Sequence, residues 1–150
     1  MVNLQLAELT TDNLFAALRL PPQAADEEPV APVAWSVAEA YVNPTAWPRV
    51  ILDSDEVVGF VMANWNPTEE IPEFRAGIWR LNVAREARRR GVGRFAVEQV
   101  AEEARRRGLD RLTVLWVPGP DGPEEFYLRC GFRKTGNLLF DEVVGELLLD

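Results

Sequence analysis

A short loop rich in arginine and glycine joins a strand-like segment to a helix-like segment, and this junction constrains the fold most strongly. The apolar run Ile78 to Val83 precedes the loop, and an amphipathic helical pattern from about Gly91 to Arg107 follows it. Another strand-like run, Arg111 to Val117, comes next. This order predicts an α/β fold in which a helix crosses over between two strands of a mixed sheet.

The chemistry of the loop Arg88-Arg89-Arg90-Gly91-Val92-Gly93-Arg94 predicts a phosphate-bearing ligand. Its two glycines allow the backbone to approach an anion closely. The helix that follows contributes unpaired N–H groups and the positive end of its dipole. We expect the peptide N–H groups from Gly91 to Arg94 to make most of the contact, helped by forked arginine hydrogen bonds, above all from Arg94. At least one of Arg88 and Arg90 is then a solvated charge, and an ordinary loop-to-helix junction is the alternative.

The same residues resemble a known family signature. Arg88-x-x-Gly91-x-Gly93 matches the pattern Q/R-x-x-G-x-G/A of GNAT-type N-acetyltransferases, which bind acetyl-CoA by this loop. Downstream, Tyr127-Leu128-Arg129-Cys130-Gly131-Phe132 is similar to the Y-x-x-x-G-F element of that family. The resemblance extends over about Val57 to Gly136. Val30 to Ala40, followed by a Trp-Pro pair, looks like the bacterial spermine/spermidine acetyltransferase branch.

This resemblance implies a fold, an activity and a set of site residues. The fold would be the GNAT fold, a mixed central sheet of about seven strands flanked by about four helices, in one domain over residues 1–150. The activity would be transfer of an acetyl group from acetyl-CoA to a primary amine, with a polyamine or similar small cationic amine as the favoured acceptor. Tyr127 would protonate the departing thiolate. The cofactor would contact the backbone of Leu81, Asn82 and Val83 and the loop residues Arg88, Arg89, Arg90, Gly91, Val92, Gly93 and Arg94.

The group that takes a proton from the acceptor amine stays open. An alkyl ammonium of pKa about 10.4 requires roughly 4–5 kcal/mol to become neutral at pH 7, so a base would help. Many family members carry a glutamate on the strand before the loop, whereas this chain has Arg75 to Arg80 there. Glu73, just before that strand, is the first candidate. The alternatives are a water chain or one of Glu28, Glu39, Glu69 and Glu70.

Charge is distributed unevenly along the chain, whose net charge is −8. Residues 1–73 hold twelve acidic side chains and two arginines, whereas residues 74–150 hold fourteen basic and twelve acidic side chains. A basic cofactor loop beside an acidic half favours a cationic second substrate, although acidic surfaces also simply aid solubility. The negative net charge and the lack of interleaved aromatic and basic residues argue against nucleic-acid binding.

Cysteine and histidine usage removes several classes of chemistry. Cys130 is the single cysteine and the chain has no histidine, which excludes an internal disulfide and a Cys/His zinc site. An acyl-cysteine route through Cys130 would lack a histidine base. No apolar run of about 18 residues and no secretory signal pattern occur, so we expect no membrane span and a cytoplasmic location. Dimers are frequent in the family that the chain resembles, so a homodimer is one expected state.

Periodicity and turn residues predict the individual elements. Ser36-x-x-Glu39 has the pattern of a capping box, so a helix is expected to begin at Val37. Trp35 and Trp65 are either aromatic faces of an acceptor cleft or core residues. Other expected helices are Thr11–Leu18 and Glu124–Arg129, and the expected strands are Leu4–Glu8, Arg49–Asp53, Glu56–Asn64, Phe74–Val83, Arg133–Asn137 and Val143–Leu149.

Several other functions are also compatible with the sequence. The acceptor could instead be a peptide amine, an amino acid or an aminoglycoside. The missing strand glutamate is compatible with a non-catalytic acyl-CoA-binding module, which the retained Tyr127 opposes. A glycine loop at a helix start is also compatible with a nucleotide ligand. An asparagine that often follows the fifth strand in the family is replaced here by Pro118-Gly119-Pro120-Asp121, so that cofactor contact is expected to be altered.

Overall fold

The computed structural model describes residues 2–21 and 32–150, and the strands within them form one seven-stranded sheet. The mixed α/β fold and the strand number therefore agree with expectation. The sheet order is β1-β2-β3-β4-β5-β7-β6. The strands are β1 (Leu4–Ala7), β2 (Ala46–Asp53), β3 (Glu56–Trp65), β4 (Ala76–Val83), β5 (Arg111–Trp116), β6 (Arg133–Leu139) and β7 (Glu142–Leu148). The described helices are α1 (Leu14–Leu18), α2 (Val33–Val42), α3 (Val92–Arg106) and α4 (Glu124–Arg129), with 3-10 turns η1 (Pro72–Phe74) and η2 (Arg85–Arg90).

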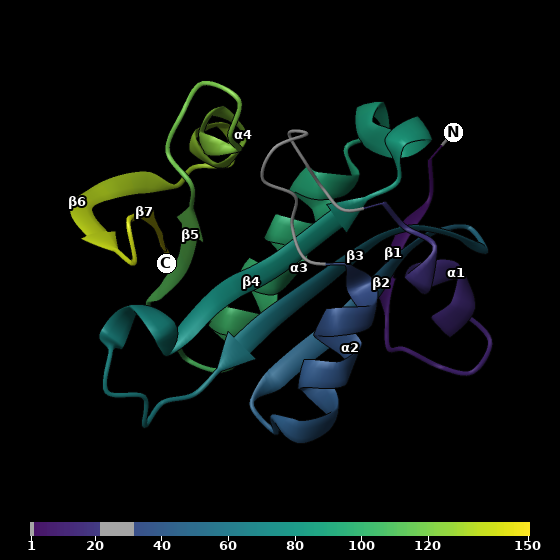
Figure 1. Ribbon diagram of the computed structural model, residues 1–150, viewed down its shortest axis with the longest axis horizontal. Helices are drawn as coiled ribbons and strands as arrows, with labels where there is room; N and C mark the ends of the chain where they lie inside the picture. The colour runs from purple at the N-terminus through teal and green to yellow at the C-terminus, as the bar shows by residue number, and fades with distance from the viewer. Residues whose placement is uncertain (1, 22–31) are drawn as a thin grey trace.

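The elements form a three-layer arrangement with the sheet in the middle. α1 and α2 lie on one face of the sheet and α3 lies on the other (Figure 1). All strand pairs are antiparallel except β4 with β5, which η2 and α3 connect as the expected crossover. None of the described helices has both the length and the apolar composition needed to cross a bilayer.

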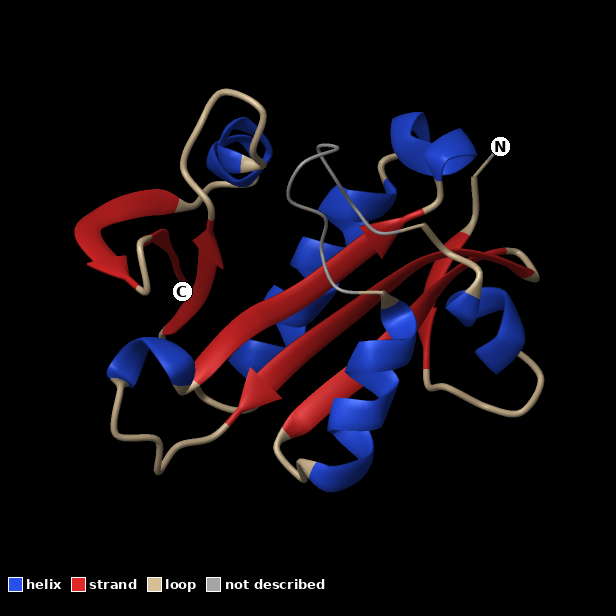
Figure 2. Ribbon diagram, in the orientation of Figure 1, coloured by secondary structure: helices blue, strands red, loops and turns tan. Residues whose placement is uncertain are grey.

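The parallel ladder between β4 and β5 is very short. Only Gly77 with Thr113 and Ile78 with Val114 are paired, although β4 continues to Val83. Beyond these pairs β5 turns away from β4 toward α4 (Figure 2). On its other side β4 stays paired with β3 up to Val83, with a register shift where Trp79 is inserted between Ile78 and Arg80. The sheet is therefore split at its centre while β4 remains anchored.

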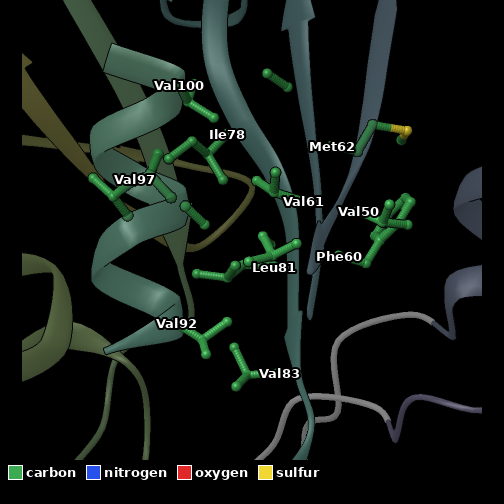
Figure 3. Packing of buried hydrophobic residues seen from close by; sticks show 14 of the residues in the cluster. Val50, Phe60, Val61, Met62, Ile78, Leu81, Val83, Val92, Val97 and Val100 are labelled. Carbon is green, nitrogen blue, oxygen red and sulfur yellow. The ribbon is translucent and has the colours of Figure 1, made fainter. Parts of the chain in front are cut away.

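The core on the α3 side holds the helix against β4. Val92, Val97 and Val100 of α3 face apolar side chains of β4, whereas Val50, Phe60 and Met62 lie on the opposite side of the sheet (Figure 3). Alternation along each strand sends neighbouring side chains to opposite faces, so both layers contribute to the core. The predicted amphipathic pattern is confirmed: Phe95 is only partly buried, and the buried residues of α3 are Val92, Ala96, Val97, Val100, Ala101 and Ala104. The β4 residues that α3 covers are Ile78, Leu81 and Val83.

The expected start of α2 is wrong. The helix begins at Val33, directly after Pro32, so Ser36 and Glu39 lie inside it and form no capping box. Ser36 is fully buried in the second turn. Pro32 explains the earlier start, because proline is tolerated where a helix begins and its missing N–H costs nothing there. The capping pattern was therefore a coincidence of spacing.

Smaller differences concern the ends of other elements. α1 begins at Leu14 and not at Thr11, because Thr10 and Asn13 close a hydrogen-bonded turn first, with the Thr10 N–H donating to Asn13 Oδ1 at 2.9 Å. β2 begins at Ala46 and runs through Pro48. Phe74 belongs to η1 and not to β4. Each difference lies at a place where local hydrogen bonds or tertiary pairing override strand or helix propensity.

Replacement of a buried valine should test the α3 packing. Val100→Ala should lower the free energy of unfolding by about 2 kcal/mol, because it removes two buried methyl groups and leaves a cavity against β4. Val42→Ala is the matched control, since Val42 is also helical but 75% exposed, and its effect should stay within about 0.5 kcal/mol. Urea unfolding followed by tryptophan fluorescence measures both. Equal effects of the two changes would contradict this packing.

Candidate active site

The loop that the sequence identified forms the N-terminus of α3. Gly91 has a left-handed backbone with φ +76°, which favours glycine, and a Cβ placed on it would have no atom of the described residues within 4 Å. The first helical hydrogen bond runs from the Phe95 N–H to the Gly91 carbonyl at 2.9 Å. The N–H groups of Val92, Gly93 and Arg94 therefore precede the helical ladder and are available to an anion. The open space at Gly91 and these donors fit a phosphate group.

The two loop glycines have different structural roles. A Cβ on Gly93 would lie 3.0 Å from Cζ of Phe126, so the absence of a side chain there lets α4 approach α3. Arg94 reinforces this junction, because its Nη1 donates to the carbonyl of Arg129 at 3.2 Å. Gly93 thus serves packing between helices, whereas Gly91 serves the turn of the backbone.

Arg88, Arg89 and Arg90 differ in their exposure and in their contacts. Arg88 and Arg89 are exposed. Arg90 is held by Asp53 and Glu56, with Nη1 3.0 Å from Asp53 Oδ2 and 3.2 Å from Glu56 Oε1. A hydrogen bond from the Asn3 N–H and the Arg90 guanidinium lower the pKa of the Asp53 carboxyl. Arg90, one of the expected phosphate ligands, therefore fastens the loop to the turn between β2 and β3, and it is not a solvated charge.

A cleft of about 380 Å³ opens where β4 and β5 separate. Leu81, Asn82 and Val83, the expected pantetheine-binding segment, continue β4 beyond the last pair with β5 and are buried. The wall of the cleft comes from five elements. Its lining residues are Glu39 of α2, Glu73 and Phe74 of η1, Gly77, Ile78, Trp79 and Arg80 of β4, Thr113, Val114 and Leu115 of β5, and Glu142 of β7.

The cleft is acidic. Among the described residues that line it are the carboxylates of Glu39, Glu73 and Glu142 and one guanidinium, that of Arg80, which together give a net charge of −2 at neutral pH. Arg80 Nη2 lies 3.1 Å from Glu39 Oε1. In the part of the chain that the structure describes, no group of three or more histidine, cysteine or acidic side chains is placed to hold a metal ion. An excess of carboxylates in a cleft attracts cations and repels anions.

The glutamates that the sequence offered as candidate bases lie in different surroundings. Glu73 lines the cleft, and its main-chain carbonyl accepts a 2.6 Å hydrogen bond from Thr113 Oγ1, which fixes η1 to β5. Glu39 also lines the cleft but is engaged by Arg80. Glu69 and Glu70 are not part of the cleft wall. Glu28 lies outside the described residues.

The β6–β7 hairpin contributes a residue to the wall of the cleft, a role that was not predicted from the sequence. The ring of Phe140 at its turn stacks on Phe74 of η1, with centroids 5.9 Å apart and planes 6° from parallel. Phe140 and Asp141 both adopt positive φ in this tight turn. The stack brings Glu142, the first residue of β7, to the cleft. No sequence pattern could identify this residue, since the contact joins segments 66 positions apart, at residues 74 and 140.

Tyr127 lies in an aromatic cluster at the end of β5. Its ring stacks on Trp116 at 5.6 Å and makes edge contacts with Phe126 at 5.0 Å and Phe132 at 5.5 Å. The residue is 7% exposed. Burial raises the pKa of its phenol above the ordinary value, so the hydroxyl stays protonated at neutral pH. Tyr127 is therefore a neutral phenol at neutral pH.

Two other expectations concern single side chains. Burial also raises the pKa of the Cys130 thiol, which disfavours the thiolate that an acyl-cysteine route needs. Trp65 is a core residue that packs edge-on against Trp47 at 5.9 Å, and Trp35 is 69% exposed on α2 without lining the cleft. The tryptophan in the cleft is Trp79, at the register shift in β4. Strand periodicity could not identify it, because an inserted residue interrupts the alternation of faces.

Known structures share this architecture. An acetyltransferase from Thermus thermophilus is 21% identical, with a TM-score of 0.73 over 99% of this chain and 100% of its own. The ribosomal-protein-S18-alanine N-acetyltransferase from Escherichia coli is 17% identical, with a TM-score of 0.71 over 99% and 95% of the two chains. The PaiA N-acetyltransferase from Thermoplasma acidophilum, solved in complex with coenzyme A, is 11% identical, with a TM-score of 0.71 over 97% and 99%. These likenesses show the fold.

The sequence comparison shows the family. No curated protein sequence matches the chain significantly. The acetyltransferase (GNAT) family matches residues 11–132. This span includes the loop from Arg88 to Arg94, strands β4 and β5, and Tyr127. The chain therefore belongs to the GNAT family of acetyltransferases, which makes it an acyltransferase with acetyl-CoA as its co-substrate.

Proposed function

We propose that this acetyltransferase moves the acetyl group to a primary amine of a small cationic molecule such as a polyamine. One observation carries the proposal: the described residues lining the cleft at the β4–β5 split have a net charge of −2. A negative cleft attracts and retains an ammonium-bearing acceptor and disfavours an anionic one. The alternatives are acceptors with peptide, amino-acid or aminoglycoside amines, and a module that binds acyl-CoA without catalysis.

The donor is expected to bind from the α3 side. The N–H groups of Val92, Gly93 and Arg94 would hold the diphosphate, with Arg88 and Arg89 available for charged contacts. The pantetheine arm would follow β4 along Leu81 to Val83, where β5 has already turned away. This path leads along β4 from the phosphate loop to the cleft, so the thioester would meet the acceptor at the split.

The reaction requires two protons to leave the ammonium nitrogen, of which one is balanced by protonation of the sulfur and one is released to solvent. Glu73, directly or through water, would take the ammonium proton, after which the neutral amine attacks the thioester carbonyl. The tetrahedral intermediate would then release the thiolate of coenzyme A. Tyr127 would donate its phenolic proton to that thiolate. Burial raises the phenol pKa, which keeps the proton on Tyr127 until the thiolate forms but also makes the phenol a weaker acid. The second proton of the nitrogen would leave as the intermediate collapses and would return through water to Tyr127, and Glu73 would release its proton to solvent, so one proton is released per cycle.

A thiol-release assay with a panel of amines tests the proposal directly. Acetyl-CoA is mixed with the protein and with a diamine, a monoamine, an amino acid, a peptide and an aminoglycoside, and free coenzyme A is measured with a thiol-reactive dye. Faster turnover of the aliphatic cationic amines than of the amino acid or peptide supports the proposal. Tight binding of coenzyme A with no turnover of any amine would favour the non-catalytic module.

Neutralising one exposed arginine should test the phosphate loop. Arg88→Gln should weaken coenzyme A binding about fivefold, since an exposed charge near an anion contributes on the order of 1 kcal/mol. Arg106→Gln is the control, because Arg106 lies at the opposite end of α3, roughly 20 Å away. Titration calorimetry measures both affinities. A loss that is equal for the two variants would indicate a non-specific effect of net charge.

Removal of the Tyr127 hydroxyl should affect chemistry and spare binding. Tyr127→Phe keeps the aromatic ring in the cluster, so we expect turnover to fall about 100-fold while coenzyme A affinity is unchanged. Because burial raises the phenol pKa, the wild-type rate should not decline through loss of this proton between pH 7 and pH 10. Steady-state rates over that range measure the effect. Equal losses of turnover and affinity would assign Tyr127 a structural role only.

Neutralisation of Glu73 should slow the reaction in a pH-dependent way. Glu73→Gln should lower turnover about 100-fold near pH 7, and the deficit should shrink toward pH 10, where a free amine of pKa about 10.4 is increasingly neutral without help. Glu70→Gln is the control, since Glu70 is exposed and outside the cleft wall. A deficit that stays constant with pH would argue against a role for Glu73 in deprotonation.

A further inference from the structure

An ion pair joins α2 to β4 in the acidic cleft. Arg80 Nη2 lies 3.1 Å from Glu39 Oε1, with side-chain exposures of 26% and 36%. Both residues line the cleft, and Arg80 is the one cation among the described residues of its wall. Glu39 belongs to α2 and Arg80 belongs to β4. Because both side chains line the cleft, the charge of each acts on a molecule bound there.

We propose that the Glu39–Arg80 pair sets the charge selectivity of the cleft, tuning it for an acceptor with two cationic centres. This inference rests on the proposed function and names a finer substrate class, an aliphatic diamine or a longer amine of that kind. By formal charge, the described lining residues comprise three carboxylates and the Arg80 guanidinium, which gives a net charge of −2. Glu39 thereby acts as a specificity-determining residue and not as a base.

The charge balance explains why two cationic centres fit. The reacting amine must lose its proton before it attacks the thioester, and the positive charge that then develops on its nitrogen is the same for a monoamine and a diamine. A second ammonium on the same molecule keeps its charge and remains in the field of the carboxylates. A monoamine of equal length lacks this interaction. Preference for a diamine over a monoamine therefore reports the net charge of the cleft.

The two partners of the pair predict opposite effects. Arg80→Gln makes the cleft more negative by one charge and should raise the preference for the diamine. Glu39→Gln makes it less negative by one charge and should lower that preference. A purely structural ion pair predicts the same effect for both changes, because either one breaks the same bridge. The sign of the change thus separates an electrostatic role from a structural one.

The experiment compares 1,4-diaminobutane with butylamine at low ionic strength. Their ratio of kcat/KM is measured for the wild type, Arg80→Gln, Glu39→Gln and the double variant, and their affinities are measured by calorimetry on protein saturated with coenzyme A. We expect the ratio to rise about threefold to tenfold for Arg80→Gln, to fall by a similar factor for Glu39→Gln, and to return toward wild type in the double variant. Added salt at about 0.5 M should compress these differences, since it screens partly exposed charges.

A second ion pair provides the control. Arg111 Nη1 lies 3.1 Å from Glu146 Oε2 between β5 and β7, and neither residue lines the cleft. Arg111→Gln removes the same kind of side chain from the same kind of contact, so it should leave the ratio unchanged.

The outcomes distinguish this inference from the proposed function. Shifts of the same sign, or no shift in either variant, overturn the inference even if the wild type acetylates amines. Opposite shifts in binding without turnover uphold the inference and reject catalysis. If neither amine binds the protein saturated with coenzyme A, the inference is overturned as well.

Discussion

The position at which the parallel ladder between β4 and β5 ends determines the whole site. Gly77 permits the close approach on which the ladder depends, because a Cβ there would lie 2.7 Å from Thr113 Oγ1. The same hydroxyl donates to the carbonyls of Glu73 at 2.6 Å and Ala76 at 3.1 Å, which fastens η1 to β5. The strands are thus clamped at one end and diverge after Ile78 and Val114. A cleft forms because β4 remains supported by β3 and α3 after β5 has left it.

Contacts from distant segments hold the loop from Arg88 to Arg94 at the other end of this split. Arg90 binds the acidic turn between β2 and β3, and Phe126 of α4 packs against Gly93. The loop is therefore held in place by the protein itself, which would lower the entropic cost of binding an anion there. Two of the four loop arginines, Arg90 and Arg94, bind partners within the protein, so fewer than four are free to contact an anion.

Much of the fold and part of the site could be predicted from the sequence. The alternation in β3 and β4 and the helical repeat of α3 are local patterns, and burial of one face follows from them directly. The loop glycines and the Tyr127 element were recognisable for the same reason, as short motifs. The start of α2 was predicted wrongly, because the capping pattern at Ser36 had to compete with Pro32 and with burial of Ser36 in the core. The insertion of Trp79 in the ladder between β3 and β4 could not be predicted either. It changes which side chains of β4 face the cleft, and no local sequence pattern marks it.

The sequence by itself determined the strand–loop–helix crossover, the family and the excess of acidic residues, because these depend on neighbours in the chain and on composition. Only the tertiary structure decided which charged side chains form ion pairs and which line the cleft. It joined Arg90 to Asp53, Arg80 to Glu39 and, through the stacking of Phe140 on Phe74, brought Glu142 to the cleft. These partners are separated by tens of residues, and their meeting depends on strand order, register and the end of one short ladder. Such contacts follow from packing in three dimensions, on which local patterns carry no information.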